Sequence, residues 1–70
     1  MNSIVQSVLI NKHKYTPKQA IKWLKENGFK FYKIDETENF YRFRQVNPVG
    51  FKYYRIKKIT DDIELVIGYL

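Results

Sequence analysis

The sequence predicts an α+β domain in which one amphipathic helix packs on a mostly antiparallel sheet of four to five strands. One segment carries both helix start and helix stop signals, and short runs of β-branched and aromatic residues alternate with turn residues. The 70 residues allow one small domain, which we place at residues 1–70. The expected order of the elements is β-α-β-β-β-β.

The helix is the strongest local signal in the chain. Thr16 and Gln19 form a Thr-x-x-Gln capping box, and Pro17 suits the first helical position. The Asn27-Gly28 pair supplies a stop, because Gly28 can adopt the left-handed conformation that ends a helix. The apolar positions between these signals share one side and are expected to face the sheet: Ala20, Ile21, Trp23 and Leu24.

Five runs predict strands: residues 4–10, 29–34, 40–46, 51–59 and 63–70. Polar or turn-forming residues separate the last four runs, at 35–39, 47–50 and 60–62. Successive side chains of a strand point to opposite faces, so Tyr41 and Phe43 share one face. The other face of that run carries Phe40, Arg42 and Arg44.

The same rule assigns the faces of the last two runs. The final run has one apolar face that reads as core: Ile63, Leu65, Ile67 and Tyr69. In the 51–59 run the odd-numbered residues share a face, unless a β-bulge reverses part of it: Phe51, Tyr53, Arg55, Lys57 and Ile59.

The composition excludes several classes of protein. A hydrophobic fraction of 44% with 17% aromatic residues is too apolar for a disordered basic tail. The absence of cysteine excludes disulfides and cysteine-ligated zinc. No apolar run approaches the roughly 20 residues of a membrane-spanning helix, and residues 1–14 lack the pattern of a signal peptide. We therefore expect a basic cytoplasmic domain that does not enter a membrane.

The net charge of +6 is concentrated in one part of the chain. Residues 40–59 contain six cations and no acid, and aromatic residues are interspersed among them. Cations displace counterions from phosphate and aromatic rings stack on unpaired bases, so this pattern favours a nucleic-acid-binding hairpin. The alternative is an ordinary small sheet with an aromatic core and a basic, soluble outer face. The candidate nucleic-acid-binding residues are Arg42, Arg44, Lys52, Tyr53, Arg55, Lys57 and Lys58, with Phe40 as a second stacking candidate.

A secondary basic strip accompanies the helix, and its simplest interpretation is a solvated surface. It contains Lys14, Lys18, Lys22 and Lys25, with Lys12 just upstream. Its other interpretations are non-specific phosphate contact and attraction to an acidic protein surface. Trp23 could stack or anchor an interface, but its position beside Ala20 and Leu24 favours the core.

No enzyme motif or metal site is predicted. The sequence has no phosphate-binding glycine loop, nucleophile elbow or His-Glu-x-x-His motif. Its acids form two groups in predicted turns, which favour such residues in any case: Asp35, Glu36 and Glu38, and Asp61, Asp62 and Glu64. His13 reads as an exposed loop residue. We expect no catalytic residue, metal or cofactor.

Several segments together resemble a small domain found in proteins of tailed phages and large DNA viruses. They are 8–10, 16–24, 27–29, 35–45 and 63–69, and the most specific are Ala-x-x-Trp-Leu at 20–24 and Tyr-Arg-Phe-Arg-Gln at 41–45. The resemblance implies a viral or prophage setting, in the host cytoplasm or the virion, and transfers no functional residue. An RNA-recognition domain fits less well, because its second helix and glycine-aromatic strand motif are missing.

The sequence thus predicts a small binding module with two alternative partners. The first is nucleic acid, DNA or RNA, bound with low sequence specificity through the basic hairpin. The second is protein: an interaction or virion-assembly module that binds an acidic partner or self-associates as a homodimer through a sheet edge.

Overall fold

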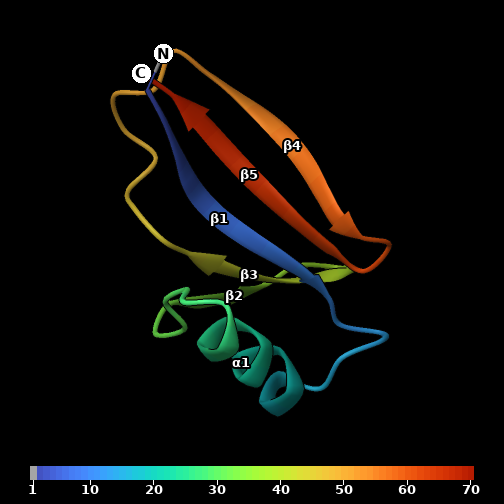
Figure 1. The fold of residues 1–70 in the computed structure, drawn as a ribbon. Coiled ribbons are helices and arrows are strands. Elements are labelled where there is room, and N and C mark those ends of the chain that lie inside the picture. Colours follow the sequence, from blue (N-terminus) through green and yellow to red (C-terminus); the bar gives the residue numbers. More distant parts are fainter. Residues whose placement is uncertain (1) are drawn as a thin grey trace.

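The computed structural model describes residues 2–70 and confirms the α+β class and the expected order of elements (Figure 1). The elements are β1 (Ser3–Asn11), α1 (Pro17–Glu26), β2 (Ile34–Glu36), β3 (Phe40–Arg44), β4 (Tyr53–Thr60) and β5 (Ile63–Tyr69). The five strands form one sheet in the order β2-β3-β1-β5-β4, and every neighbouring pair is antiparallel. The first strand of the chain therefore lies in the middle of the sheet.

The predicted helix signals are confirmed at both ends of α1. The Thr16 hydroxyl accepts a hydrogen bond from the Gln19 backbone N–H, and the Gln19 side chain accepts one from the Thr16 N–H. At the other end Gly28 has a φ of +77°. Its N–H and that of Phe29 donate to the carbonyls of Lys25 and Leu24, which completes a Schellman motif.

The core lies between α1 and one face of the sheet, which we call the helix face. Ala20 and Leu24 of α1 are fully buried, as are Ile10 of β1 and Phe43 of β3. Trp23 is only partly buried, and its ring stacks on Phe29 with a centroid distance of 5.8 Å. The predicted core face of β3 is confirmed by the burial of Tyr41 and Phe43. That of β5 is confirmed at Ile63 and Leu65, whereas Ile67 and Tyr69 are only partly buried.

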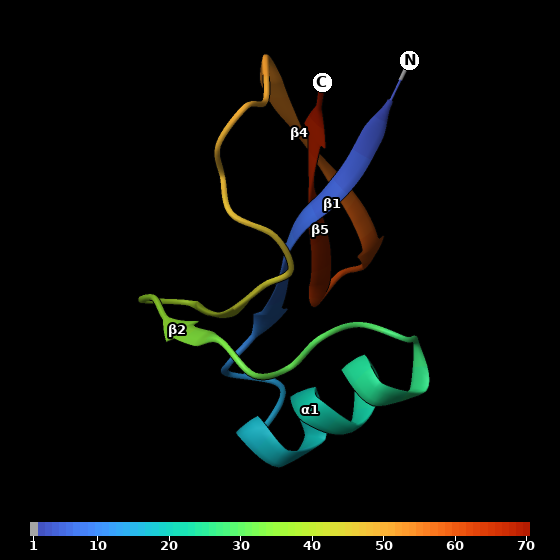
Figure 2. The same ribbon diagram turned by 90° about the vertical axis from the view of Figure 1, so that its left-hand side faces the viewer.

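The helix covers only one end of the sheet. In Figures 1 and 2, α1 lies beside β2 and β3. The start of β4 and the end of β5 lie far from the helix. All eight residues of β4 are exposed. The outer strand thus has neither face covered by another layer.

The basic region at residues 40–59 is not a hairpin, which corrects the sequence interpretation. β3 and β4 are not neighbours in the sheet, because β1 and β5 lie between them. Sequence position could not reveal this, because the strands that separate them come from the two ends of the chain. The hairpin that β4 does form is with β5, through the turn at Asp61 and Asp62.

The connection between β3 and β4 runs along the face opposite α1, which we call the open face (Figure 2). The Tyr54 hydroxyl donates to the Pro48 carbonyl at 3.2 Å, and the rings of Tyr54 and Phe51 are 5.4 Å apart. The Phe51 ring covers Gly68, where an added Cβ would lie 2.4 Å from the nearest ring carbon. Residue 68 must therefore be glycine for the Phe51 ring to pack here.

Two strand predictions differ from the structure. Residues 29–33 are irregular, and the strand begins at Ile34 and includes Asp35 and Glu36 from the predicted turn. Phe51 precedes β4 and packs on the open face, so it does not share a face with Tyr53. A register shift between Lys58 and Thr60 also ends the simple alternation at Ile59, as the possibility of a bulge allowed.

Gly68→Ala should lower the free energy of unfolding by about 1–3 kcal/mol, the usual cost of overpacking, because the Phe51 ring must move. Urea denaturation measures this change. In a Phe51→Ala background the same substitution should cost much less, since the clashing ring is gone. An equal cost in both backgrounds would contradict the proposed contact.

Candidate nucleic-acid interface

The structure divides the predicted nucleic-acid-binding residues between the two faces of the sheet. Tyr53, Arg55 and Lys57 pair with the helix-face residues of β5 and share their face. Arg42, Arg44 and Lys58 belong to the open face. These residues therefore do not make up one continuous platform.

Arg42 is built into the structure of the open face. Its Nε donates to the Ser7 hydroxyl and its Nη2 donates to Gln6 Oε1, both at 3.1 Å. Gln6 and Ser7 are fully buried at the β1 bulge, and the Gln6 amide also donates to the Val46 carbonyl at 2.9 Å. Arg42 thus satisfies buried polar atoms and holds the start of the crossing connection.

The other cations of the open face have acidic neighbours. The Arg44 Nη2 lies 3.7 Å from an Asp35 carboxylate oxygen. Lys58 lies directly across from Glu64 in the β4–β5 ladder, so both side chains belong to the same face. These carboxylates reduce the positive potential that a polyanion would meet on the open face.

The helix face of the β4–β5 hairpin combines cations and aromatic rings without an acid. The Tyr53 and Tyr69 rings stack with a centroid distance of 4.8 Å and an interplanar angle of 9°. The Arg55 guanidinium lies over the Tyr53 ring, 5.8 Å from its centroid. Lys57 follows on the same face, and Lys52 precedes β4 with its backbone N–H bonded to the Tyr69 carbonyl at 2.8 Å.

The exposure of this surface follows from the fold. α1 lies at the other end of the sheet, so no second layer covers Tyr53, which remains 41% exposed. The β5 residues on this face are apolar or aromatic, and the acids of the hairpin are at its turn or on the open face. We call Tyr53, Arg55, Lys57 and Tyr69 the tyrosine–cation surface.

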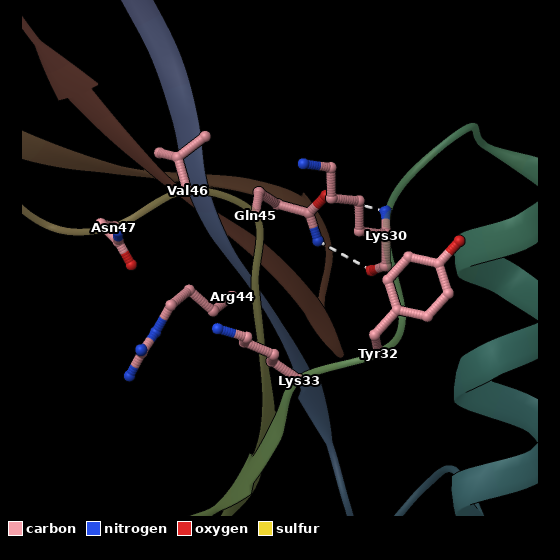
Figure 3. A pocket seen from close by; sticks show the side chains of 7 residues that line it. All are labelled: Lys30, Tyr32, Lys33, Arg44, Gln45, Val46 and Asn47. Carbon is pink, nitrogen blue, oxygen red and sulfur yellow. Dashed lines mark hydrogen bonds between the residues drawn. The ribbon is translucent and has the colours of Figure 1, made fainter.

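A second cationic group lies at the opposite edge of the sheet and was not predicted. A cavity of about 370 Å³ is lined by residues of the 29–33 segment and the end of β3, shown in Figure 3: Lys30, Tyr32, Lys33, Arg44, Gln45, Val46 and Asn47. Only Arg44 was among the candidates. Lys30 and Lys33 read as part of a strand, and their approach to Arg44 depends on pairing that the sequence does not reveal.

The lysines of the secondary basic strip are exposed, as a solvated surface requires: Lys14, Lys18, Lys22 and Lys25. Lys25 lies over the Phe31 ring at 4.9 Å, and Lys12 forms an ion pair with Glu36 at 3.1 Å. His13 is exposed, with its Nε2 3.3 Å from the Asn39 side-chain oxygen. The strip contains no ring stack comparable with that on β4 and β5 within residues 2–70.

Residues 2–70 contain neither a cluster of metal-ligating side chains nor a helix that could span a membrane. No group of three or more histidine, aspartate or glutamate side chains is arranged to hold a metal ion. The described helix is too short to cross a membrane.

Comparison with protein-family models, curated proteins and solved structures finds no match. The resemblance to the phage and large-virus domain therefore stays a prediction from the sequence segments that carry it. The function must be argued from the surface itself.

Arg42→Met should lower the free energy of unfolding by about 1.5–3 kcal/mol, the range for hydrogen bonds made by charged groups. Arg55→Gln, a control on the exposed strand, should change it by about 0.5 kcal/mol or less. Urea denaturation of both variants makes the comparison. If Arg42→Met leaves the free energy of unfolding unchanged, the contacts of Arg42 with Gln6 and Ser7 do not stabilise the fold.

Proposed function

We propose that this protein is a low-specificity binding module for single-stranded nucleic acid, and that the tyrosine–cation surface is its contact site. The observation that carries the proposal is the partly exposed Tyr53–Tyr69 stack with Arg55 and Lys57 on the same face. Single-strand binders combine cations that follow the backbone with aromatic rings on which bases stack.

The placement of charge favours the helix face over the open face for this role. Arg55 and Lys57 have no acid on their face of the hairpin, whereas Arg44 and Lys58 lie near carboxylates. Arg42 already donates two hydrogen bonds inside the protein. In the proposed complex, Arg55 and Lys57 contact phosphates, and a base stacks on the tyrosine pair.

A protein partner is the second candidate, and the edge position of β4 favours it. An eight-residue edge strand has an outward row of backbone groups to which another strand can add. Ile56, at 57% exposure, would gain from such a contact. Antiparallel self-pairing centred on Ile56 would place Arg55 opposite Lys57, so an acidic strand is the better partner. The viral or prophage assembly role belongs to this alternative.

Binding to an unstructured oligonucleotide of about 10 nucleotides, within the usual site size, should be measurable at about 50 mM salt and weaken steeply as salt rises. Arg55→Gln/Lys57→Gln should reduce the slope of log K against log salt by about 1.4, because two phosphate contacts are lost. Tyr69→Leu should weaken binding by about 1–3 kcal/mol through lost stacking. Fluorescence anisotropy measures all three.

The matched control is Lys18→Gln/Lys22→Gln, which removes the same charge from exposed positions of α1. It should leave the salt slope nearly unchanged. No binding by the unaltered protein at about 50 mM salt would refute the proposed function. Specific co-purification with an acidic protein, or self-association in sedimentation, would then support the protein partner.

A further inference from the structure

We propose that the cavity at the β2–β3 edge binds a phosphomonoester, either the terminal phosphate of a nucleic-acid strand or that of a free mononucleotide. The strand-end form rests on the function proposed above. The mononucleotide form does not depend on that function. In both forms the site is separate from the tyrosine–cation surface, because β3 and β4 are separated by two strands.

The charges that line the cavity come from two chain segments. Lys30 and Lys33 belong to the segment that leaves α1, and Arg44 ends β3. In Figure 3 the Lys33 and Arg44 side chains extend to the same side, and Lys30 extends along the other side of Gln45. No acid is among the residues that line the cavity.

Hydrogen bonds hold the backbone of the lysine segment against the end of β3. The Gln45 side chain accepts a hydrogen bond from the Lys30 N–H at 2.8 Å and donates one to the Lys30 carbonyl at 2.9 Å (Figure 3). The Arg44 N–H donates to the Lys33 carbonyl at 3.1 Å. The backbones of both lysines are thus fixed to the end of β3, and only their exposed side chains have to be ordered when an anion binds.

The charge of the cavity matches a monoester better than a phosphodiester. An acid lies close to one of the three cations: the Asp35 carboxylate is 3.7 Å from the Arg44 guanidinium. Three cations against this one carboxylate leave a net charge of +2. A phosphomonoester carries about −1.5 to −2 at neutral pH, whereas an internal phosphodiester carries one negative charge. Among nucleic acids and their components, strand ends and mononucleotides carry such a phosphate group.

The cavity also has features that suit the rest of a nucleotide. Arginine can bind phosphate oxygens through two parallel N–H donors, which gives Arg44 the main role. The Tyr32 ring is 76% exposed at the rim and tilts against Phe31 with a centroid distance of 4.8 Å. It is an aromatic surface at the edge of the cavity on which a base can stack.

The first test is a pair of NMR titrations on the unaltered protein, with adenosine monophosphate and with adenosine. The monophosphate should shift the amide signals of Lys30, Lys33 and Arg44, and adenosine should shift them far less. Inorganic phosphate tests whether the phosphate group suffices. If neither phosphate compound shifts these signals, the mononucleotide form is wrong.

The second test compares one oligonucleotide with a phosphate or a hydroxyl at its 5′ end, and separately at its 3′ end. A phosphate on one of the ends should tighten binding about tenfold, as new charge-assisted hydrogen bonds predict. Arg44→Gln should remove this preference, and Asp35→Asn should increase it. The folded state of each variant is checked by amide signal dispersion.

The control is Arg55→Gln, which should weaken binding of every oligonucleotide but leave the end-phosphate ratio unchanged. Oligonucleotide binding with equal affinity for phosphate and hydroxyl ends would overturn the strand-end form and leave the proposed function intact. Absence of oligonucleotide binding with a retained response to adenosine monophosphate would overturn the proposed function and the strand-end form, and would leave the mononucleotide form intact. The whole proposal is wrong if neither adenosine monophosphate nor inorganic phosphate shifts the amide signals and if an end phosphate does not tighten oligonucleotide binding.

Discussion

One short helix has to cover a five-stranded sheet, and the rest of the structure depends on this mismatch. A ten-residue helix is about 15 Å long and, with its side chains, about 10 Å wide, whereas neighbouring strands lie about 4.8 Å apart. Ala20 and Leu24 therefore pack with residues of β1, β3 and β5 and do not reach β4. The packing of α1 on the sheet therefore explains both the buried core beneath the helix and the exposure of β4.

The open face is stabilised in a different way. A buried polar group on that face, Gln6 with Ser7, takes its hydrogen bonds from Arg42 and gives one to Val46. No buried side-chain nitrogen or oxygen within residues 2–70 lacks a partner. The crossing connection then adds Phe51 over Gly68, so a chain segment takes the place of a second helix.

Local features of this fold were predictable from the sequence, and non-local ones were not. The capping box at Thr16, the stop at Gly28 and the alternation in β3 depend on neighbours in the chain, and all are confirmed. The hairpin expected at 40–59 was wrong because strand order depends on pairing between distant segments.

The same distinction applies to the candidate sites. Alternation along the chain correctly placed Tyr53, Arg55 and Lys57 on one face, but the register with β5 was needed to show that this is the helix face. The stacking partner Tyr69 read as a core residue, and only the position of α1 shows why it stays partly exposed. Lys30 and Lys33 gave no signal, since their approach to Arg44 arises in an irregular segment.

The strand order also sets the sequence of events during synthesis on the ribosome. β4 is made before β5, yet β5 is its pairing partner in the sheet. Until β5 emerges, Ile56 and Ile59 have no paired strand beside them, and one edge of β1 stays unpaired. A nascent chain with exposed strand edges is prone to aggregate, and the cations of β4 repel other copies of the same strand. The residues proposed to bind a polyanion would then protect the chain before it has folded.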